Sequence, residues 1–368
     1  MKKSAFFLTV LLVASLIVGC AGTPVVYYSD CTCPTGSHEA VNTPVETTPV
    51  ESTPAETYVP AEGAVKTGLY LTTDVTGSAD ASAEAEGQAK FEATMVAVLV
   101  DAGGVIQSCR IDGINTSVGF GADGVITTDL TAAPQTKNEL GENYGMVAWG
   151  GAIAEWDAQA KALADYAVGK TVEELKNGAV DETGYAPEGS DLASSATIYL
   201  GGYVSAIEAA VNNAQHLGAQ AGDELVLACT TDISSSTNAD AENAGLAQLD
   251  VTVTALTLNG ETITSCTIDA VQAKVNFDAA GAITSELASH VATKNELGPD
   301  YGMVAWAGAI AEWNEQAASF ASYVTGKTAA EVAGIAVDES THPTDADLSA
   351  SVTIAIGGFQ ALILKACQ

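Results

Sequence analysis

The feature that most constrains the fold of this chain is an internal repeat. Residues 136–156 recur as residues 293–313, an offset of 157, and 18 of the 21 aligned positions are identical. The segments upstream of the two copies, residues 91–100 and 248–257, share only two of ten positions. A repeat of this period predicts two copies of one structural unit. Residues 136–156 and their copy have stayed nearly identical while the segments upstream diverged, which indicates that the sequence of this stretch is constrained.

The divergent parts of the two copies keep a pattern typical of β-strands. They contain β-branched or apolar runs separated by turns such as Asp101-Ala-Gly-Gly104 and Asn259-Gly260. In the first copy the expected strands are residues 94–100, a short strand toward Cys109, residues 115–120 and residues 125–128. In the second copy they are residues 251–257, a short strand toward Cys266, residues 273–277 and residues 282–285. This pattern predicts three or four antiparallel strands per copy.

Helices are expected after the strands in each copy. In the first copy one helix, ended by Gly169, should bury a face whose residues recur at helical spacing: Trp149, Ile153, Trp156, Ala160, Leu163 and Ala167. Core packing is the default role of the Trp149–Trp156 pair, and contact with a flat aromatic ligand is the alternative. Thr171 and Thr328 open capping boxes of a short second helix.

A seven-residue motif precedes a third expected helix in each copy. It reads Asp191-Leu-Ala-Ser-Ser-Ala-Thr197 before residues 198–214, and Asp347-Leu-Ser-Ala-Ser-Val-Thr353 before residues 354–367. A hydroxyl at a helix start lies beside unpaired backbone N–H groups and the positive end of the helix dipole, where a phosphate binds well. The simpler interpretation is that these hydroxyl groups only cap the helix.

The sequence therefore predicts an α+β fold class. Two tandem repeats, each a small antiparallel sheet followed by helices, are expected as separate domains at residues 64–215 and 222–368. Each is long enough to bury a core of its own.

Ahead of the repeats, the sequence predicts export and a membrane anchor. Met1-Lys-Lys, an apolar run at 5–18 and Gly19-Cys20 are typical of a secretory signal peptide, residues 1–19. The run is too short for a comfortable membrane span. Ile17-Val-Gly-Cys20 looks like a bacterial lipobox, in which Cys20 is acylated and becomes the mature N-terminus. Residues 20–63 are rich in Pro and Thr and predict a disordered tether on the extracellular face of the cell membrane.

Composition excludes some classes of function. The chain has 13 Lys and Arg residues against 46 Asp and Glu, a net charge of −33, and no basic stripe for nucleic acid. The four histidines and seven cysteines lack ligand spacing, so no zinc, haem or iron–sulfur site is expected. A lone loop lysine is usually just solvated. In so acidic a chain, however, the repeated Lys137 and Lys294 are credible partners for an anion.

Two motifs of this sequence resemble motifs of known flavoproteins. The motif that ends at Thr197 and Thr353 resembles the acceptor motif of the flavin transferase system, Asp-x-x-Ser/Thr-Gly-Ala-Thr, whose last Thr receives FMN through a phosphoester bond. Thr136-Lys-Asn-Glu-Leu-Gly141, followed by Tyr144-Gly-Met146, is similar to the flavin-contacting loop of FMN-binding domains. With the lipobox and tether, the whole chain resembles the extracellular electron transfer flavoprotein lipoproteins of Gram-positive bacteria, whose signal peptides can also yield a peptide pheromone.

The resemblance implies two covalent FMN groups, on Thr197 and Thr353. The flavinylation motifs would include Asp191, Ser194, Ser195, Ala196, Asp347, Ser351 and Val352. Ser195 and Ser351 stand where the motif has Gly, Ala350 replaces a hydroxyl residue, and Val352 replaces Ala. Contacts to the flavin are implied for Lys137, Glu139, Leu140, Gly141, Tyr144 and Met146, and for Lys294, Glu296, Leu297, Gly298, Tyr301 and Met303.

The implied function is that of a lipid-anchored electron carrier rather than a substrate-converting enzyme. An FMN transferase would load it, a membrane quinol-oxidising system would reduce it, and ferric iron or free flavins outside the cell would oxidise it. The alternative is an acidic cell-surface adhesin or binding module built from two repeats. A solute-binding lipoprotein is disfavoured by the tandem duplication. Colour that survives denaturation distinguishes the first function from the second.

Overall fold

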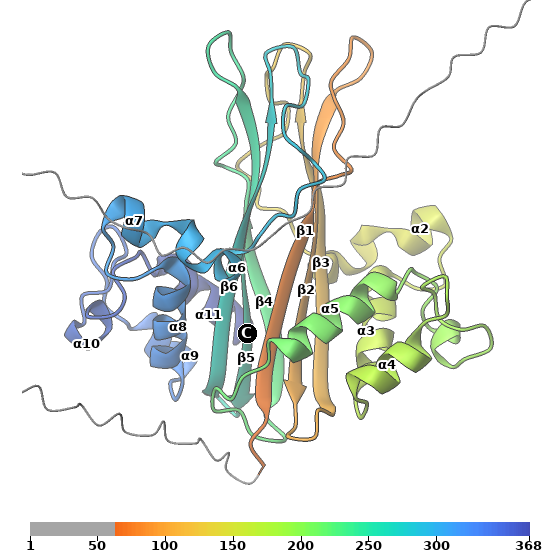
Figure 1. Ribbon diagram of the computed structural model, residues 1–368, viewed down its shortest axis with the longest axis vertical. Coiled ribbons are helices and arrows are strands. Elements are labelled where there is room, and N and C mark those ends of the chain that lie inside the picture. The colour runs from red at the N-terminus through yellow and green to blue at the C-terminus, as the bar shows by residue number, and fades with distance from the viewer. Residues whose placement is uncertain (1–62) are drawn as a thin grey trace, which may run out of the picture. The chain divides into compact units, whose positions relative to one another are not determined.

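The computed structural model describes residues 63–368, and Figure 1 shows their arrangement. The predicted signal peptide, the acylated Cys20 and the tether up to residue 62 lie outside the described residues. Within the described range no helix combines the length and the hydrophobicity of a membrane span.

Six long strands form two three-stranded antiparallel sheets, and the α+β prediction is confirmed. The strands are β1 (Lys66–Asp74), β2 (Gly87–Val100) and β3 (Ile106–Phe120) in the first sheet, and β4 (Glu224–Asp232), β5 (Gly245–Asn259) and β6 (Thr262–Phe277) in the second. Sequence analysis missed β1 and β4 and divided both β3 and β6 in two. The strands expected at 125–128 and 282–285 are only single bridges, from Ile126 to Phe120 and from Ile283 to Phe277.

The burial pattern of β2 explains why these segments are strands. Ala89, Phe91, Ala93 and Met95 are buried at alternate positions, which is the pattern of a sheet with one covered face. From Met95 to Val100 every side chain is buried, because the other face of the sheet is also covered there.

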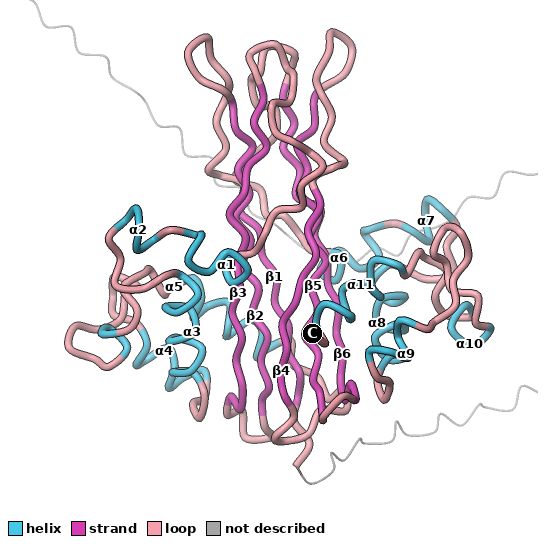
Figure 2. Tube along the Cα trace, turned by 180° about the vertical axis from the view of Figure 1, so that it is seen from behind, coloured by secondary structure: helices cyan, strands magenta, loops and turns pink. Residues whose placement is uncertain are grey.

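The two sheets pack face to face with helices outside, so that residues 63–368 form four layers. Figure 2 shows the strands in the middle and the helices on the two flanks. Apolar residues of both sheets share the central core, in which the rings of Phe120 and Phe277 stack with their centroids 4.1 Å apart. Two outer cores lie between each sheet and its own helices.

The two halves, expected as separate domains, form one compact unit that holds all the described residues. The physical reason is the inner face of each sheet, which is apolar and packs against the inner face of the other sheet in one shared core. Polar contacts join the halves as well: Thr67 Oγ1 lies 2.7 Å from Ser265 Oγ, and the N–H of Ile126 donates to Asn238 Oδ1 at 2.9 Å.

Short helices follow each sheet, as predicted. In the first half they are α1 (Lys137–Leu140), α2 (Met146–Gly150), α3 (Trp156–Ala167), α4 (Val172–Ala179) and α5 (Gly201–Asn212). In the second they are α6 (Lys294–Leu297), α7 (Met303–Ala307), α8 (Trp313–Val324), α9 (Ala329–Ala333), α10 (Ala346–Ser349) and α11 (Gly357–Ala366). The capping boxes expected at Thr171 and Thr328 are present.

The single helix predicted through Trp149 and Trp156 is wrong. Gly151, at φ +64°, ends α2, and a separate helix α3 begins at Trp156. Trp156 is buried as expected, but Trp149 is 90% exposed and therefore not part of the core. Its indole ring lies against the backbone of Gly145, where a Cβ would be only 2.3 Å from the ring. Trp306 is equally exposed in the second half.

Candidate functional site

The two motif threonines do not cap a helix. Helix α5 begins at Gly201 with Leu200 at its N-cap, and α11 begins at Gly357 with Ile356 at its N-cap. No side chain caps either helix. The expected placement of the hydroxyl groups at a helix start is therefore wrong, and so is the capping interpretation. The reason is that a tertiary contact holds the motif away from the helix.

A buried glutamine makes that contact in each half. Gln159 Oε1 accepts the backbone N–H of Thr197 at 2.8 Å and that of Ile198 at 3.2 Å, and Thr197 Oγ1 donates to it at 3.3 Å. Gln159 Nε2 donates to the carbonyl of Ala154 at 2.7 Å. The whole Gln159 side chain is inaccessible to solvent, and a buried amide has to be satisfied in this way.

The second half repeats this arrangement. Gln316 Oε1 accepts the N–H of Thr353 at 2.7 Å and that of Ile354 at 3.2 Å, and its Nε2 donates to the carbonyl of Ala311 at 2.9 Å. Sequence analysis missed both glutamines. The available signal was a polar residue retained at the offset of 157 on the otherwise apolar face of a predicted helix.

The motif around each threonine leaves its polar residues outside. Asp191, Ser194, Ser195 and Thr197 are exposed, and so are the corresponding Asp347, Ser351 and Thr353. Ala196 and Val352 are buried instead, in the outer core of their own half. The departures from the usual motif have a physical account, because Val fills an apolar site as Ala does. Ser195 has φ −120°, which does not require Gly.

Residues 136–156 and their copy 293–313, called the retained segments below, each hold a lysine ammonium group over aromatic rings. Lys137 Nζ lies 5.3 Å from the ring centroid of Tyr144 and 4.8 Å from that of Trp156. Lys294 Nζ lies 4.8 Å from the centroids of both Tyr301 and Trp313. No salt bridge within residues 63–368 includes either lysine. The rings stabilise the ammonium groups and leave them available to an anion.

A glutamate, half-buried in the first half and buried in the second, fixes the segment that carries the exposed tryptophan. Glu155 accepts the N–H groups of Met146 and Val147 at 2.8 and 3.0 Å, which are the first two N–H groups of α2. Glu312 bonds α7 in the same way at 2.8 and 3.0 Å. A carboxylate at a helix N-terminus is favourable, and here it joins the start of α2 to the start of α3.

The other predicted contact residues lie in the turns that connect these helices. Leu140 ends α1, Met146 begins α2, and Gly141 and Tyr144 lie between them; Leu297, Met303, Gly298 and Tyr301 have the same places at α6 and α7. Glu139 and Glu296 complete the capping boxes of α1 and α6. The structure brings Lys137, Tyr144 and Trp156 together, and Gln159, one turn along α3, holds Thr197.

Beside each loop lies a carboxyl group that sequence analysis did not single out, partly buried in the first half and buried in the second. Asp112 Oδ1 accepts the N–H of Asn138 at 3.1 Å, and Asp269 Oδ1 accepts that of Asn295 at 3.1 Å. Burial raises the pKa of Asp112 and of Asp269 from the ordinary value of 3.8 to about 6, although these hydrogen bonds oppose the rise. Both groups therefore take up a proton more readily in the folded protein.

This raised pKa predicts a dependence of stability on pH. Between 3.8 and about 6 the native state holds more protons on Asp269 than the unfolded chain does. This group therefore makes the free energy of unfolding fall as pH rises through that window. In Asp269→Asn, which keeps the oxygen acceptor, we expect this contribution of about 1–3 kcal/mol to vanish. Denaturant unfolding at several pH values, with exposed Asp300→Asn as control, measures the difference. Parallel pH curves for the variant and the parent would contradict it.

Comparison with protein families, with curated proteins and with solved structures gives no match for this chain. Within the described part, no group of three or more His, Cys, Asp and Glu residues is arranged to hold a metal ion. Cys109, Cys229 and Cys266 are buried free thiols, and burial raises the pKa of each to about 12. These thiols are therefore protonated near neutral pH and poor nucleophiles.

Proposed function

We propose that this chain is a lipid-anchored extracellular electron carrier with two FMN groups, joined to Thr197 and Thr353 by phosphoester bonds. One observation carries the proposal: each half presents an exposed threonine hydroxyl group whose backbone is held by a wholly buried glutamine. The hydroxyl caps no helix, and its hydrogen bond of 3.3 Å is long. The FMN transferase thus meets a fixed backbone and an accessible oxygen atom.

The residues of each half fit the proposed group. Lys137 and Lys294 offer an ammonium group with no carboxylate partner among the described residues to an anionic or electron-rich part of a flavin. Asp191 and Asp347 are exposed, so a magnesium-bound pyrophosphate on the transferase can reach them. The same geometry in the two halves also supports the inference that they are tandem copies of one unit.

Covalent attachment suits a carrier outside the cell. A bound flavin passes one or two electrons and so can link a membrane quinol-oxidising system to ferric iron or free flavins. The covalent bond and the proposed lipid anchor keep it at a high local concentration in either redox state. The net charge of −33 attracts cationic acceptors to the surface.

A second function, that of a binding module on the cell surface, is favoured by a different observation. Val147, Trp149 and Ile153 are 47%, 90% and 56% exposed, and Val304, Trp306 and Ile310 form an equivalent exposed set in the second half. Large apolar side chains exposed this close together in the sequence are typical of a surface that contacts a ligand or a partner. Under the leading proposal, the same tryptophans are surfaces for a flat ring.

Mass spectrometry distinguishes the two functions. The chain, produced together with an FMN transferase and measured under denaturing conditions, is expected to carry two FMN phosphoester adducts and a yellow colour that survives denaturation and gel filtration. Peptide mapping should place the adducts on Thr197 and Thr353. A colourless protein of unmodified mass, produced beside a transferase that modifies a known acceptor, would leave the binding module as the better proposal.

The proposed anchor has its own test. Cys20→Ser removes the thiol that would be acylated, and the lipobox is the only anchoring signal that the sequence predicts. We expect the variant to be lost from the membrane fraction and to appear in the medium. Fractionation followed by immunoblotting measures this, and Cys31→Ser serves as the matched control. Normal membrane retention of Cys20→Ser would contradict lipid anchoring.

A further inference from the structure

The two sheets meet along two edges, which we call seams: β3 lies beside β4 at one, and β1 lies beside β6 at the other. The two seams are filled by different side chains. At the seam where β3 meets β4, Lys365 of α11 extends from the second half to the first. Its Nζ donates to the carbonyl oxygen of Cys229 at 2.7 Å and forms an ion pair with Oε1 of Glu139. An ammonium group thus closes this seam, bound to the glutamate of the retained loop of the first half.

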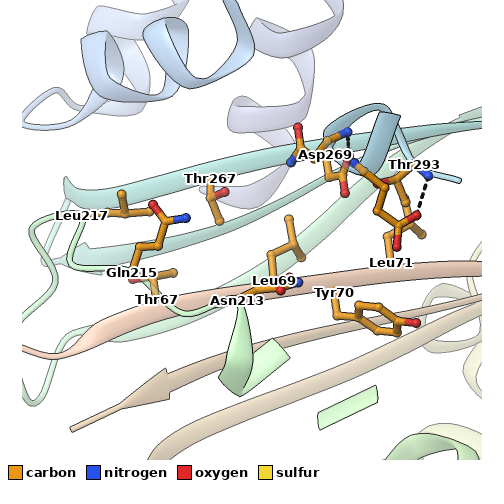
Figure 3. Close-up of a pocket in the computed structure, with 12 residues that line it drawn as sticks. Thr67, Leu69, Tyr70, Leu71, Asn213, Gln215, Leu217, Thr267, Asp269 and Thr293 are labelled. Atoms are coloured by element: carbon orange, nitrogen blue, oxygen red, sulfur yellow. Dashed lines mark hydrogen bonds between the residues drawn. The ribbon is translucent and has the colours of Figure 1, made fainter. Parts of the chain in front are cut away.

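The seam where β1 meets β6 is open instead. A cavity of about 350 Å³ lies there, and Figure 3 shows the residues around it. Its walls include Leu69 and Leu71 from β1, Thr267 and Asp269 from β6, and Glu296 from α6. Two carboxyl groups therefore line this cavity, and neither Lys nor Arg is among its described lining residues.

The last helix of the first half has no lysine at the position of Lys365. Aligning α5 with α11 through their first residues, Gly201-Gly202 and Gly357-Gly358, places Ala209 at the position of Lys365. A methyl group cannot extend across the seam to a carboxylate. Asn213, just after α5, lines the cavity instead, and its Nδ2 donates to the carbonyl oxygen of Leu69 at 3.1 Å.

The carboxylate that corresponds to Glu139 retains a free oxygen atom. Glu296 Oε2 accepts the N–H of Thr293 at 2.8 Å and lies 3.0 Å from Nε2 of His290. Its Oε1, the atom that binds lysine in Glu139, has no partner among the described residues. The Glu296 side chain is 40% exposed, and a carboxylate oxygen is a strong acceptor for a charged N–H donor.

We propose that this cavity binds a primary alkylammonium group, with its nitrogen at Glu296 Oε1 and its carbon chain against Leu69 and Leu71. Both leucines are buried, at 7% and 2% exposure, and provide the apolar wall that an alkyl chain needs. The source of the group is either a free small amine or a lysine side chain of a partner protein. The site includes neither Thr197 nor Thr353, but it shares Glu296 with the loop that is implied to contact the flavin, so the covalent FMN count of Glu296→Gln is measured beside its amine affinity.

Titration with n-butylammonium tests the site on the whole chain. We expect saturable binding of one equivalent, followed by chemical shifts of the Leu69 and Leu71 methyl groups, and no binding of n-butanol. In Glu296→Gln the affinity should fall at least tenfold. The variant should stay folded, since Gln also completes a capping box. Equal affinity in Glu296→Gln and the parent would overturn the proposal.

A second variant uses the other seam as its template. Ala209→Lys should extend an ammonium group to Glu296 as Lys365 does to Glu139, raising the melting temperature and reducing n-butylammonium binding at least tenfold. Cadaverine and an N-acetyl-lysine amide, compared in the parent protein, distinguish the two sources. Tighter binding of cadaverine points to a small amine and tighter binding of the lysine amide to a partner protein. Failure of all three amines to saturate would refute the site.

Discussion

Replacing Thr197 and Thr353 together by valine is expected to give a folded and colourless protein. Valine keeps the shape of the side chain but lacks the oxygen that forms the phosphoester. Little stability should be lost, because both side chains are exposed and each hydroxyl group makes one long hydrogen bond to a glutamine. A surface change of this kind typically costs about 0.5 kcal/mol or less. Absorbance, intact mass and denaturant unfolding on the same preparation measure both properties.

The single variants and a matched control distinguish loss of the flavin from loss of stability. Thr197→Val and Thr353→Val should each lose one of the two adducts, because each half has its own glutamine and lysine at the site. Thr171→Val is the control, since Thr171 caps α4 through a capping box. It should lose about 1 kcal/mol of stability and keep both flavins. Two covalent flavins in the double variant would end the proposal of threonine attachment.

Phe120→Ala is expected to destabilise both halves of the protein at once. Phe120 is wholly buried and stacks on Phe277 of the other sheet at 4.1 Å. Truncation of a buried phenylalanine costs about 3–5 kcal/mol. Because the central core belongs to both sheets, the loss should appear in one cooperative transition. Unfolding can be followed separately through Trp156 and Trp313 in variants in which the other tryptophans are replaced by Phe.

The two tryptophan probes should report the same denaturation midpoint before and after the substitution. Val125→Ala, at a side chain that is 44% exposed, is the control and should change the free energy of unfolding by about 0.5 kcal/mol or less. Separate midpoints for the two probes, with only the first shifted by Phe120→Ala, would show that the halves unfold independently.

Local patterns in the sequence predicted local structure well. The capping boxes at Thr171 and Thr328 depend on residues three positions apart, and both are present. The prediction of one helix through Trp149 and Trp156 failed although the spacing was right. Two adjacent glycines, Gly150 and Gly151, allow the chain to break there, and periodicity does not register such a break.

The sequence did not predict contacts between residues that are far apart along the chain. Gln159 and Thr197 are 38 residues apart, and nothing in either segment indicates that they meet. Lys365 and Glu139, which form an ion pair, belong to different halves and are far apart in the sequence. Local preference predicted a helix start beside Thr197, but the bond from its N–H to Gln159 placed that start at Gly201.

The arrangement of layers bears on how such a protein meets other molecules. Helices α2 and α7, which carry the exposed Trp149 and Trp306, lie on opposite flanks of the paired sheets in both views (Figures 1 and 2). Association rates are limited chiefly by the need to bring one particular patch into the correct orientation. A molecule with an equivalent patch on each flank relaxes that requirement, because an approach from either side finds a productive face.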